Sequence, residues 1–349
     1  MQCRHAAALG LLFVAAALAD NAVAAASVRA YALSAAGESI LGNGFACATF
    51  GPDPRTGYFS GIVQVSLPDA GCGVGVDSRS ASAASGGVTV ASNLPVGFGT
   101  PSEPRAFIGS SRGRAGFGNL GVRASASYHG SADAFTVLGA QAFGMQTEPM
   151  TFGGATGAGF YRPTFTVDGS MFNVGRTDNE VDFFYSIDAG PVFLGFRIKN
   201  SRDTVDYFEA GSGSVPSLPG MTVTGDRATG LTISGSTTFT LSIPIVFGKT
   251  TDLTFAAWAG IVPSSSVGLL TPSAGETEFS STFKLTGITV TDASGTPLDT
   301  FSITSGSGTL YDRNGVVNVP EPAAYASLLF GLLGLAVFRG SRRNRLPHV

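Results

Sequence analysis

Hydrophobic and polar residues alternate along most of the chain, and this period of two is typical of β-strands with one buried face. From Phe239 to Ile245, large apolar residues occupy every second position and Pro244 falls on the opposite face. Because proline cannot donate a hydrogen bond within a sheet, we expect this strand at a sheet edge. No long segment between the two ends of the chain shows the 3.6-residue apolar spacing of a helix.

Turn residues between alternating segments predict two β-hairpins, and a change of parity predicts one β-bulge. Gly287 marks the bulge, because the apolar positions switch faces between Leu285 and Ile288. The expected turns are Asp188-Ala189-Gly190-Pro191, between strands at 181–187 and 192–198, and Asp168-Gly169, between strands at Thr164–Val167 and Met171–Val174.

These patterns predict an all-β fold, either an antiparallel β-sandwich or a barrel. The composition of the 349-residue chain agrees, since it has 48 glycines and only 13% charged residues, while 26 phenylalanines can fill a core. The Gly/Ala/Ser-rich β region 27–154 and the β-sandwich region 155–318 are expected to form two units or one domain that contains both. Within the first, roughly Gly71–Gly130 is either a long insertion or a set of flat strands packed through small side chains.

Residues 1–26 have the order of a secretory signal peptide. A charged start precedes an apolar run, Ala6–Ala19, and small residues of the A-x-A type follow at 22–26. The run is too short to span a bilayer, and no stop-transfer charges follow it. We therefore expect export through the inner membrane and removal of this segment; a buried N-terminal helix is the alternative.

The C-terminal residues show three consecutive features. The tetrapeptide Val319-Pro320-Glu321-Pro322 is followed by an uncharged segment, Ala323–Phe338, and then by four arginines. A transmembrane helix over 323–338 would nearly span the hydrocarbon core, and the positive-inside rule would keep the arginines in the cytoplasm. A C-terminal core helix with a solvated basic tail is the alternative. The stop-transfer arginines are Arg339, Arg342, Arg343 and Arg345.

In order, spacing and position, residues 319–345 resemble the tripartite PEP-CTERM sorting signal of Gram-negative bacteria. The resemblance implies that exosortase, a membrane cysteine protease, cleaves the chain near Pro320-Glu321-Pro322. It also implies a transient inner-membrane anchor, followed by delivery to the cell surface or extracellular matrix of a bacterium that makes exopolysaccharide. The β-rich body is similar to the ectodomains of such proteins. Nothing in the resemblance implies a catalytic role.

Cys47 and Cys72 are the two cysteines that remain after removal of residues 1–26. In an oxidising compartment, an even pair favours a disulfide. Closing a loop of about 25 residues would stabilise the fold by roughly 3.5 kcal/mol. Two separate buried thiols are the alternative. The sequence has no C-x-x-C motif, which argues against a zinc ribbon.

Motifs of catalysis and cofactor binding lack the context that they require. His129 is the one imidazole of the expected mature body, so a Ser-His-Asp site would depend on it. Gly109–Gly113 matches G-x-S-x-G around Ser111, and Gly116–Gly121 matches G-x-G-x-x-G, but no helical pattern follows either motif. We predict no catalytic residue and no cofactor. The net charge of −3 argues against nucleic-acid binding.

Polar residues before the first expected hairpin form the one candidate metal site. Asp178, Asn179 and Glu180 are oxygen-rich and lie close to Asp182, as calcium ligands could. They do not follow an EF-hand loop, so a solvated strand edge with Asp182 facing water is the favoured interpretation, and no bound metal is predicted. Trp258 has apolar neighbours, which favour a place in the core over a sugar-binding surface.

We expect an exported cell-surface or matrix protein with a structural or adhesive role, and no enzyme activity. Few charges and many hydroxyl groups suit a stable displayed scaffold. A carbohydrate-binding module of the polysaccharide matrix is the alternative. A secreted glycan hydrolase is a third class, and it would need two carboxyl groups facing each other about 5–10 Å apart. The expected partners are exosortase, the membrane and extracellular polysaccharide.

Overall fold

The structure is a computed structural model, and every element that it describes is a β-strand in an antiparallel pair, as predicted. No helix that could span a lipid bilayer occurs among the described residues. Residues 1–24 of the expected signal peptide, Cys47, Cys72 and the sorting segment 319–345 lie outside them. The described residues are 25–39, 75–100, 103–129, 135–175, 177–188, 190–200, 204–226, 229–263 and 273–317.

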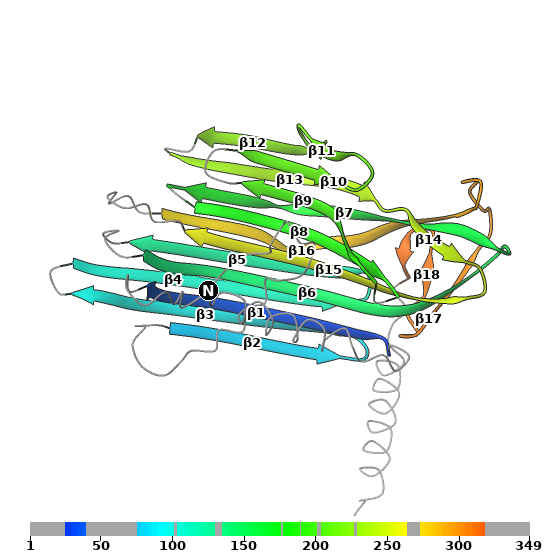
Figure 1. Cartoon of the computed structure of the whole chain (residues 1–349), viewed down its shortest axis with the longest axis horizontal. Helices are drawn as coiled ribbons and strands as arrows, with labels where there is room; N and C mark the ends of the chain where they lie inside the picture. The colour runs from blue at the N-terminus through cyan, green and yellow to red at the C-terminus, as the bar shows by residue number, and fades with distance from the viewer. Residues whose placement is uncertain are drawn as a thin grey trace, which may run out of the picture. The chain divides into compact units, whose positions relative to one another are not determined.

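The described strands form a nine-stranded sheet, sheet I, in the order β11-β10-β9-β8-β15-β6-β1-β2, with β17 paired to β6 (Figure 1). Its strands are β1 (Ser27–Ser39), β2 (Gly75–Ala83), β6 (Phe135–Gly153), β8 (Thr177–Ile187), β9 (Val192–Asn200), β10 (Val205–Glu209), β11 (Gly213–Val215), β15 (Thr250–Pro263) and β17 (Ser302–Ser305).

An eight-stranded sheet, sheet II, follows the order β12-β13-β7-β16-β5-β4-β3, with β14 paired to β7. A short pair, β18 (Tyr311–Asp312) and β19 (Gly315–Val316), completes the described strands. The strands of sheet II are β3 (Gly87–Thr100), β4 (Glu103–Gly116), β5 (Asn119–His129), β7 (Ala158–Val174), β12 (Met221–Asp226), β13 (Gly230–Thr240), β14 (Ile243–Val246) and β16 (Ser273–Asp292).

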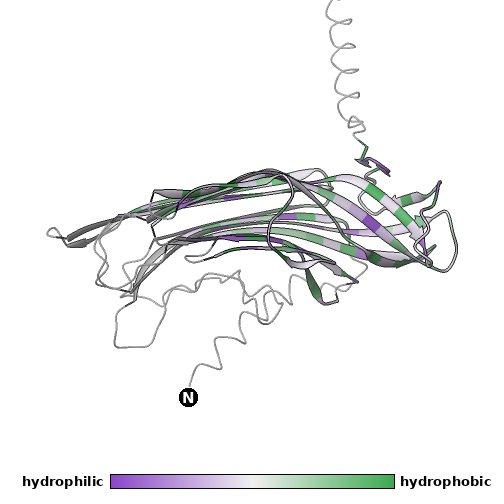
Figure 2. Ribbon diagram, turned by 90° about the horizontal axis from the view of Figure 1, so that it is seen from above, coloured by the Kyte–Doolittle hydropathy of each residue, from purple (hydrophilic) through white to green (hydrophobic). Residues whose placement is uncertain are grey.

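The two sheets stack face to face in a sandwich-like arrangement, and Figure 2 shows the two layers. β2 lies against β3, β1 and β6 lie against β4, and β15 lies against β5 and β16. Strands from the two sequence regions, 27–154 and 155–318, are neighbours in both sheets, because β6 pairs with β15 and β5 pairs with β16.

Three local predictions are confirmed. The alternation over 239–245 continues through β13 and β14, where Pro244 is exposed and β14 pairs only with β7 among the described strands. β8 and β9 form the hairpin predicted around 188–191. The register of β16 on β7 shifts between Leu285 and Gly287, which is the predicted bulge.

The hairpin predicted at Asp168-Gly169 is wrong. β7 runs without a turn from Ala158 to Val174, and this dipeptide pairs with β13. Gly169 does not adopt the positive φ of a turn glycine. A Cβ at this position would lie 2.5 Å from the carbonyl oxygen of Glu278 on β16. The glycine therefore allows close packing between strands, although its place after an aspartate is also typical of turns.

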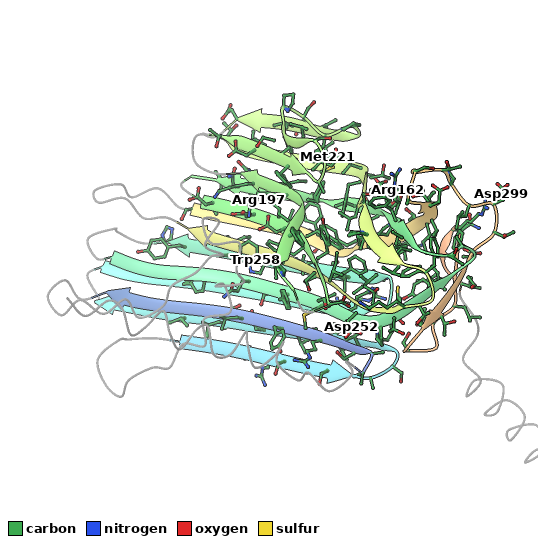
Figure 3. All side chains as sticks on the ribbon, turned by 45° about the vertical axis from the view of Figure 1, so that its right-hand side comes forward. Arg162, Arg197, Met221, Asp252, Trp258 and Asp299 are labelled. Atoms are coloured by element: carbon green, nitrogen blue, oxygen red, sulfur yellow. The ribbon has the colours of Figure 1, made fainter. Side chains whose placement is uncertain are left out.

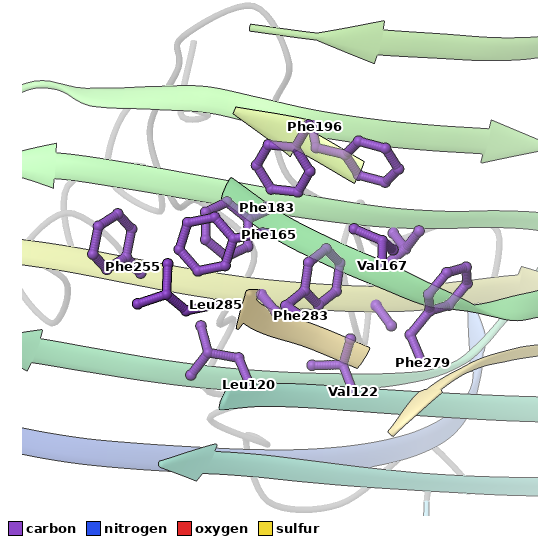
Figure 4. Close-up of a cluster of buried hydrophobic side chains, with 14 of the residues drawn as sticks. Leu120, Val122, Phe165, Val167, Phe183, Phe196, Phe255, Phe279, Phe283 and Leu285 are labelled. Carbon is purple, nitrogen blue, oxygen red and sulfur yellow. The ribbon is translucent and has the colours of Figure 1, made fainter. Parts of the chain in front are cut away.

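Phenylalanine side chains fill the space between the sheets around β7, β8, β15 and β16 (Figure 4). The ring centroids of Phe165 and Phe183 lie 4.7 Å apart, and those of Phe239 and Phe283 lie 5.2 and 5.3 Å from Phe183. All four side chains are at most 2% exposed. Burying a phenylalanine side chain contributes roughly 1.5–3 kcal/mol, so this cluster supplies a large part of the stability.

Glycines replace these rings where β1 and β6 face β4. A Cβ added at Gly113 would lie 2.5 Å from the carbonyl oxygens of both Tyr31 and Phe143. A Cβ added at Gly144 would lie 2.3 Å from the carbonyl oxygen of Arg114. The backbones of the two sheets therefore contact each other directly here, with no side chain between them.

Buried hydroxyl groups link the sheets in the same region. The Oγ atom of Ser92 lies 2.7 Å from that of Ser34 and 2.8 Å from that of Ser111, which joins β1 to β3 and β4. Each of these buried hydroxyls therefore has a hydrogen-bond partner. Of the two interpretations of the Gly-rich region, its described part shows strands packed through small side chains, because β2 to β5 cover most of 75–129.

Replacing Gly113 with alanine is expected to destabilise the protein by at least about 2 kcal/mol, because the new methyl group would overlap two backbone oxygens. Gly97→Ala is the matched control, since a Cβ there has nothing within 4 Å. The control should leave stability unchanged or raise it slightly. Urea unfolding of both variants measures the difference; equal stabilities would contradict the direct contact between the sheets.

Candidate functional site

The face of sheet I that turns away from sheet II carries a row of cross-strand neighbours from five strands. In the register of the sheet, Arg197 on β9 lies opposite Asp182 on β8, which lies opposite Trp258 on β15. The row continues through Phe143 on β6 to Tyr31 on β1. Arg197 and Trp258 are labelled in Figure 3. We call these five residues the cross-sheet row.

The charged end of the row is a partly buried ion-pair network with Asp182 at its buried centre. Arg197 donates from Nε to Asp182 Oδ1 at 2.7 Å and from Nη2 to Oδ2 at 2.9 Å, a bidentate geometry. The same Nε lies 2.7 Å from Glu180 Oε1, and Lys199 Nζ lies 3.4 Å from Glu180 Oε2. Two acidic side chains on β8 therefore face two basic side chains on the adjacent strand β9. The side chain of Asp182 has no exposed surface.

Burial raises the pKa of Asp182 to about 7, and the nearby charge of Glu180 raises it as well, while the hydrogen bond from Arg197 opposes both. Burial alone would lower the pKa of Arg197, but its hydrogen bond to Asp182 and the two carboxylates raise it. The guanidinium therefore stays charged, and Asp182 takes up a proton as the pH falls below about 7.

The expectation that Asp182 faces water is wrong. Its place on the face away from the core follows from alternation, but that face is itself buried around the row. A signal for this was present in the sequence, because β15 is apolar on both faces through Phe255, Ala256, Ala257 and Trp258. A continuous apolar run is typical of a strand buried on both sides.

The candidate calcium ligands do not share a face. Asn179 points toward the core, where its Nδ2 donates to the carbonyl oxygens of Phe172 at 2.8 Å and Glu276 at 3.2 Å. Glu180 belongs to the ion-pair network on the opposite face of β8, and alternation places Asp178 on that face too. Among the described residues, no group of three or more His, Cys, Asp or Glu side chains could hold a metal ion.

The aromatic end of the row is also covered. Trp258 is 7% exposed and Phe143 is 5% exposed, so the predicted burial of the tryptophan is confirmed. The indole Nε1 of Trp258 donates to Gln141 Oε1 at 3.2 Å. Its ring covers Gly260, where a Cβ would lie 2.3 Å from the Cζ2 atom of the indole. These contacts fix the indole against the sheet, and the row does not form an exposed sugar-stacking platform.

The two carboxyl groups of the network are poorly placed for glycoside hydrolysis. Such enzymes hold two carboxyl groups on either side of the scissile bond. Glu180 and Asp182 instead lie two positions apart on one strand, and both contact the same guanidinium nitrogen of Arg197. The guanidinium occupies the space that a sugar would need, so the arrangement favours a structural ion-pair network over an acid–base pair.

The motifs found in the sequence lie in strands and a hairpin. Ser111 is in the middle of β4, where its Oγ donates to the carbonyl oxygen of Leu33 at 3.1 Å. Gly116–Gly121 spans the turn between β4 and β5, with Gly118 at a φ of 71°. His129 is exposed at the end of β5. Neither motif precedes a helix, which a nucleophile elbow or a dinucleotide-binding loop requires.

Glu148 on β6 is a second buried acid, and no pattern in the sequence pointed to it. It has no exposed surface, and it accepts hydrogen bonds from the hydroxyls of Ser307 and Tyr311. Burial raises the pKa of Glu148, and the two hydroxyl donors oppose that shift. Through these bonds, Glu148 ties the last described segment of the chain to sheet I. The charge pattern of the sequence gave no sign of this pairing across more than a hundred residues.

Comparisons with known proteins provide no further guide to this site. No protein-family model, no curated protein and no solved structure matches the chain.

Replacing Asp182 with asparagine is expected to remove a pH dependence of stability. The pKa of Asp182 is raised from 3.8 to about 7, so between these values the folded protein holds a proton that the unfolded chain releases. The free energy of unfolding of the wild type, relative to Asp182→Asn, should therefore fall as the pH rises through this window. Urea unfolding at several pH values checks this, with Asp168→Asn on β7 as an exposed control. If the free energy of unfolding of the wild type relative to Asp182→Asn instead rises with pH, the charge of Arg197 has a larger effect on the pKa of Asp182 than burial does.

Proposed function

We propose that this chain is an exported protein that is sorted to the cell surface or extracellular matrix, where it has a structural or adhesive role. The observation that carries the proposal is the order of features at the C-terminus: the tetrapeptide at 319–322, the uncharged segment 323–338 and the arginines that follow. In this proposal exosortase cleaves the chain near Pro320-Glu321-Pro322 after a transient stay in the inner membrane. The signal-like residues 1–26 support export at the other end.

The described body suits a displayed scaffold. Its buried charges serve structure, since Asp182 is held by Arg197 and Glu148 by two hydroxyls. The outer face of sheet II is rich in hydroxyl groups that pair across strands: Thr164 lies 2.9 Å from Thr240, and Thr166 lies 2.9 Å from Thr286, between Oγ1 atoms. Such cross-strand pairs stabilise a sheet that faces water on one side. A polar, rigid face of this kind can lie in contact with hydrated polysaccharide.

Mass spectrometry of the protein from the cells that make it tests the sorting proposal. We expect a mature N-terminus close to Ala24 or Ala26 and a C-terminus near Pro320-Glu321-Pro322, in the surface or matrix fraction. A surface form that still contains Arg345 would contradict processing of the tail. A cytosolic form that keeps both Met1 and Val349 would contradict export.

Carbohydrate binding is the alternative function, and one observation favours it. Phe172 on β7 is 38% exposed on the outer face of sheet II, and its cross-strand neighbours are Glu276 and Thr232. Glu276 also accepts a hydrogen bond from Arg123 at 2.7 Å. An exposed ring flanked by hydrogen-bonding groups is a common way to hold a sugar.

Retention on immobilised matrix polysaccharide separates this alternative from a purely structural role. If the protein binds carbohydrate through this surface, Phe172→Ala should lose retention, while Phe193→Ala, at another exposed phenylalanine on sheet I, should keep it. No retention of the wild type would rule the alternative out.

A further inference from the structure

The edges of the two sheets differ in how they are protected. At one end of sheet II, β3 contains Pro95 in its middle, and Asp77 of β2 accepts a hydrogen bond from the backbone N–H of Asn93 at 2.9 Å. The neighbouring edge strand of sheet I, β2, carries the exposed ion pair of Arg79 and Asp77. Proline, charge and capped backbone groups are the usual devices that prevent strands from pairing with another chain.

The opposite end of sheet II has fewer of these devices, and the backbone N–H of Met221, which donates to the carbonyl oxygen of Leu218 at 3.1 Å, is a capped group there. Among the described strands, β12 pairs only with β13. It contains no proline, lysine or arginine, and its one charged residue, Asp226, is turned back to accept the backbone N–H of Thr229 at 2.8 Å. Apart from Met221, whose hydrophobic side chain packs partly against the core, the residues of β12 are exposed. The start of the strand, at Met221, is labelled in Figure 3.

The hydrogen-bond pattern identifies which backbone groups of β12 face outward. Ser236 donates its N–H to the carbonyl oxygen of Gly220, and the register of the pair is constant along the strand. Bonded and non-bonded positions alternate in an antiparallel pair, so Thr222 and Thr224 face β13 with their backbone groups. The N–H and carbonyl of Val223 therefore point away from β13, toward the open edge.

The side chain at this position is also incompletely covered. Val223 is 48% exposed, although it lies on the inner face of sheet II, directly opposite the fully buried Ile233. A strand added beyond β12 would cover the valine and continue the apolar inner face of the sheet. The exposed side chain and the outward-pointing N–H and carbonyl thus belong to the same residue. One additional strand would cover the valine and form hydrogen bonds with both backbone groups.

We propose that β12 is a self-association edge, and that its occupant is β12 of a second copy of this chain in antiparallel orientation. The short strand is self-complementary when it is centred on Val223. Val223 then exchanges two hydrogen bonds with Val223 of the second copy, and the N–H of Gly225 reaches the carbonyl of Met221. Thr222 of each copy lies opposite Thr224 of the other. The pairing merges the two copies of sheet II into one continuous sheet and does not depend on how the protein is exported.

The proposed pairing places only one residue of β12 opposite itself. In a hydrogen-bonded antiparallel pair the two Cα atoms are about 5.5 Å apart, which is within the range of a disulfide. Val223→Cys in the full chain should therefore give a disulfide-linked dimer under mild oxidation. Thr222→Cys is the matched control, because two such residues would be offset along the strands and beyond disulfide range.

The experiment compares the two variants with the wild type, which still contains Cys3, Cys47 and Cys72, on a non-reducing gel. We expect a dimer band with Val223→Cys that is lost on reduction, and no dimer above the wild-type level with Thr222→Cys. Mass spectrometry of the band should find two linked peptides that each contain position 223. No dimer, equal dimer from both variants, or a link from position 223 to another protein or to a native cysteine would overturn the proposal.

Proline at position 223 supplies an independent measurement. Since the N–H of Val223 points away from β13, Val223→Pro removes only an outward donor and leaves the β12–β13 bonds in place. If β12 is the association edge, light scattering of the full chain in detergent should show loss of the dimer with Val223→Pro. Val246→Lys, at an exposed valine of the edge strand β14, should leave the dimer intact. Persistence of the dimer in Val223→Pro would place the interface elsewhere.

Discussion

The backbones of the two sheets contact each other directly where β1 and β6 face β4, and this contact fixes how closely the two layers pack. A side chain at Gly113 or Gly144 would overlap carbonyl oxygens of the opposite sheet. Further along the sheets, phenylalanine rings such as Phe165 and Phe183 hold the same two layers apart. The chain is rich in both glycine and phenylalanine, and the two residue types lie in different parts of the fold. Glycine, alanine and serine predominate where the two layers touch, and phenylalanine rings fill the space where the layers are further apart.

The chain has few charged residues, and the buried acids Asp182 and Glu148 have structural roles. Arg197 neutralises Asp182 on the outer face of sheet I, and Glu148 is satisfied by hydroxyl donors from the C-terminal segment. A buried carboxylate is costly unless it is paired or hydrogen-bonded, so these groups fix neighbouring strands in one arrangement. The outer face of sheet II carries cross-strand hydroxyl pairs and the exposed ion pairs of Arg123 with Glu276 and Glu278. A rigid body with this surface is consistent with the proposed role as a displayed scaffold, and the open edge of β12 gives it a route to lateral assembly.

Much of the fold could be predicted from the sequence, because alternation is a local property. The β8–β9 hairpin, the edge proline at 244 and the bulge at Gly287 all follow from the parity of a few neighbouring residues. Asp168-Gly169 was predicted wrongly because a glycine can serve either a turn or a close contact, and only the opposite strand decides which. The candidate site was harder to predict from the sequence, because its contacts also come from other strands. Alternation gave the face of Asp182 correctly, but its burial depends on partners that come from other strands.

Native-state hydrogen exchange can measure whether the glycine contacts couple the two sheets into one unfolding unit. The glycine contacts involve β1, β4 and β6, and the phenylalanine cluster lies around β7, β8 and β15. If these two regions form one cooperative unit, their slowest amides should exchange with the same opening free energy. Denaturant should lower the opening free energies of both regions together. Exchange of β1, β4 and β6 through a separate opening of clearly lower free energy would contradict this coupling. It would show that the phenylalanine cluster alone holds the fold.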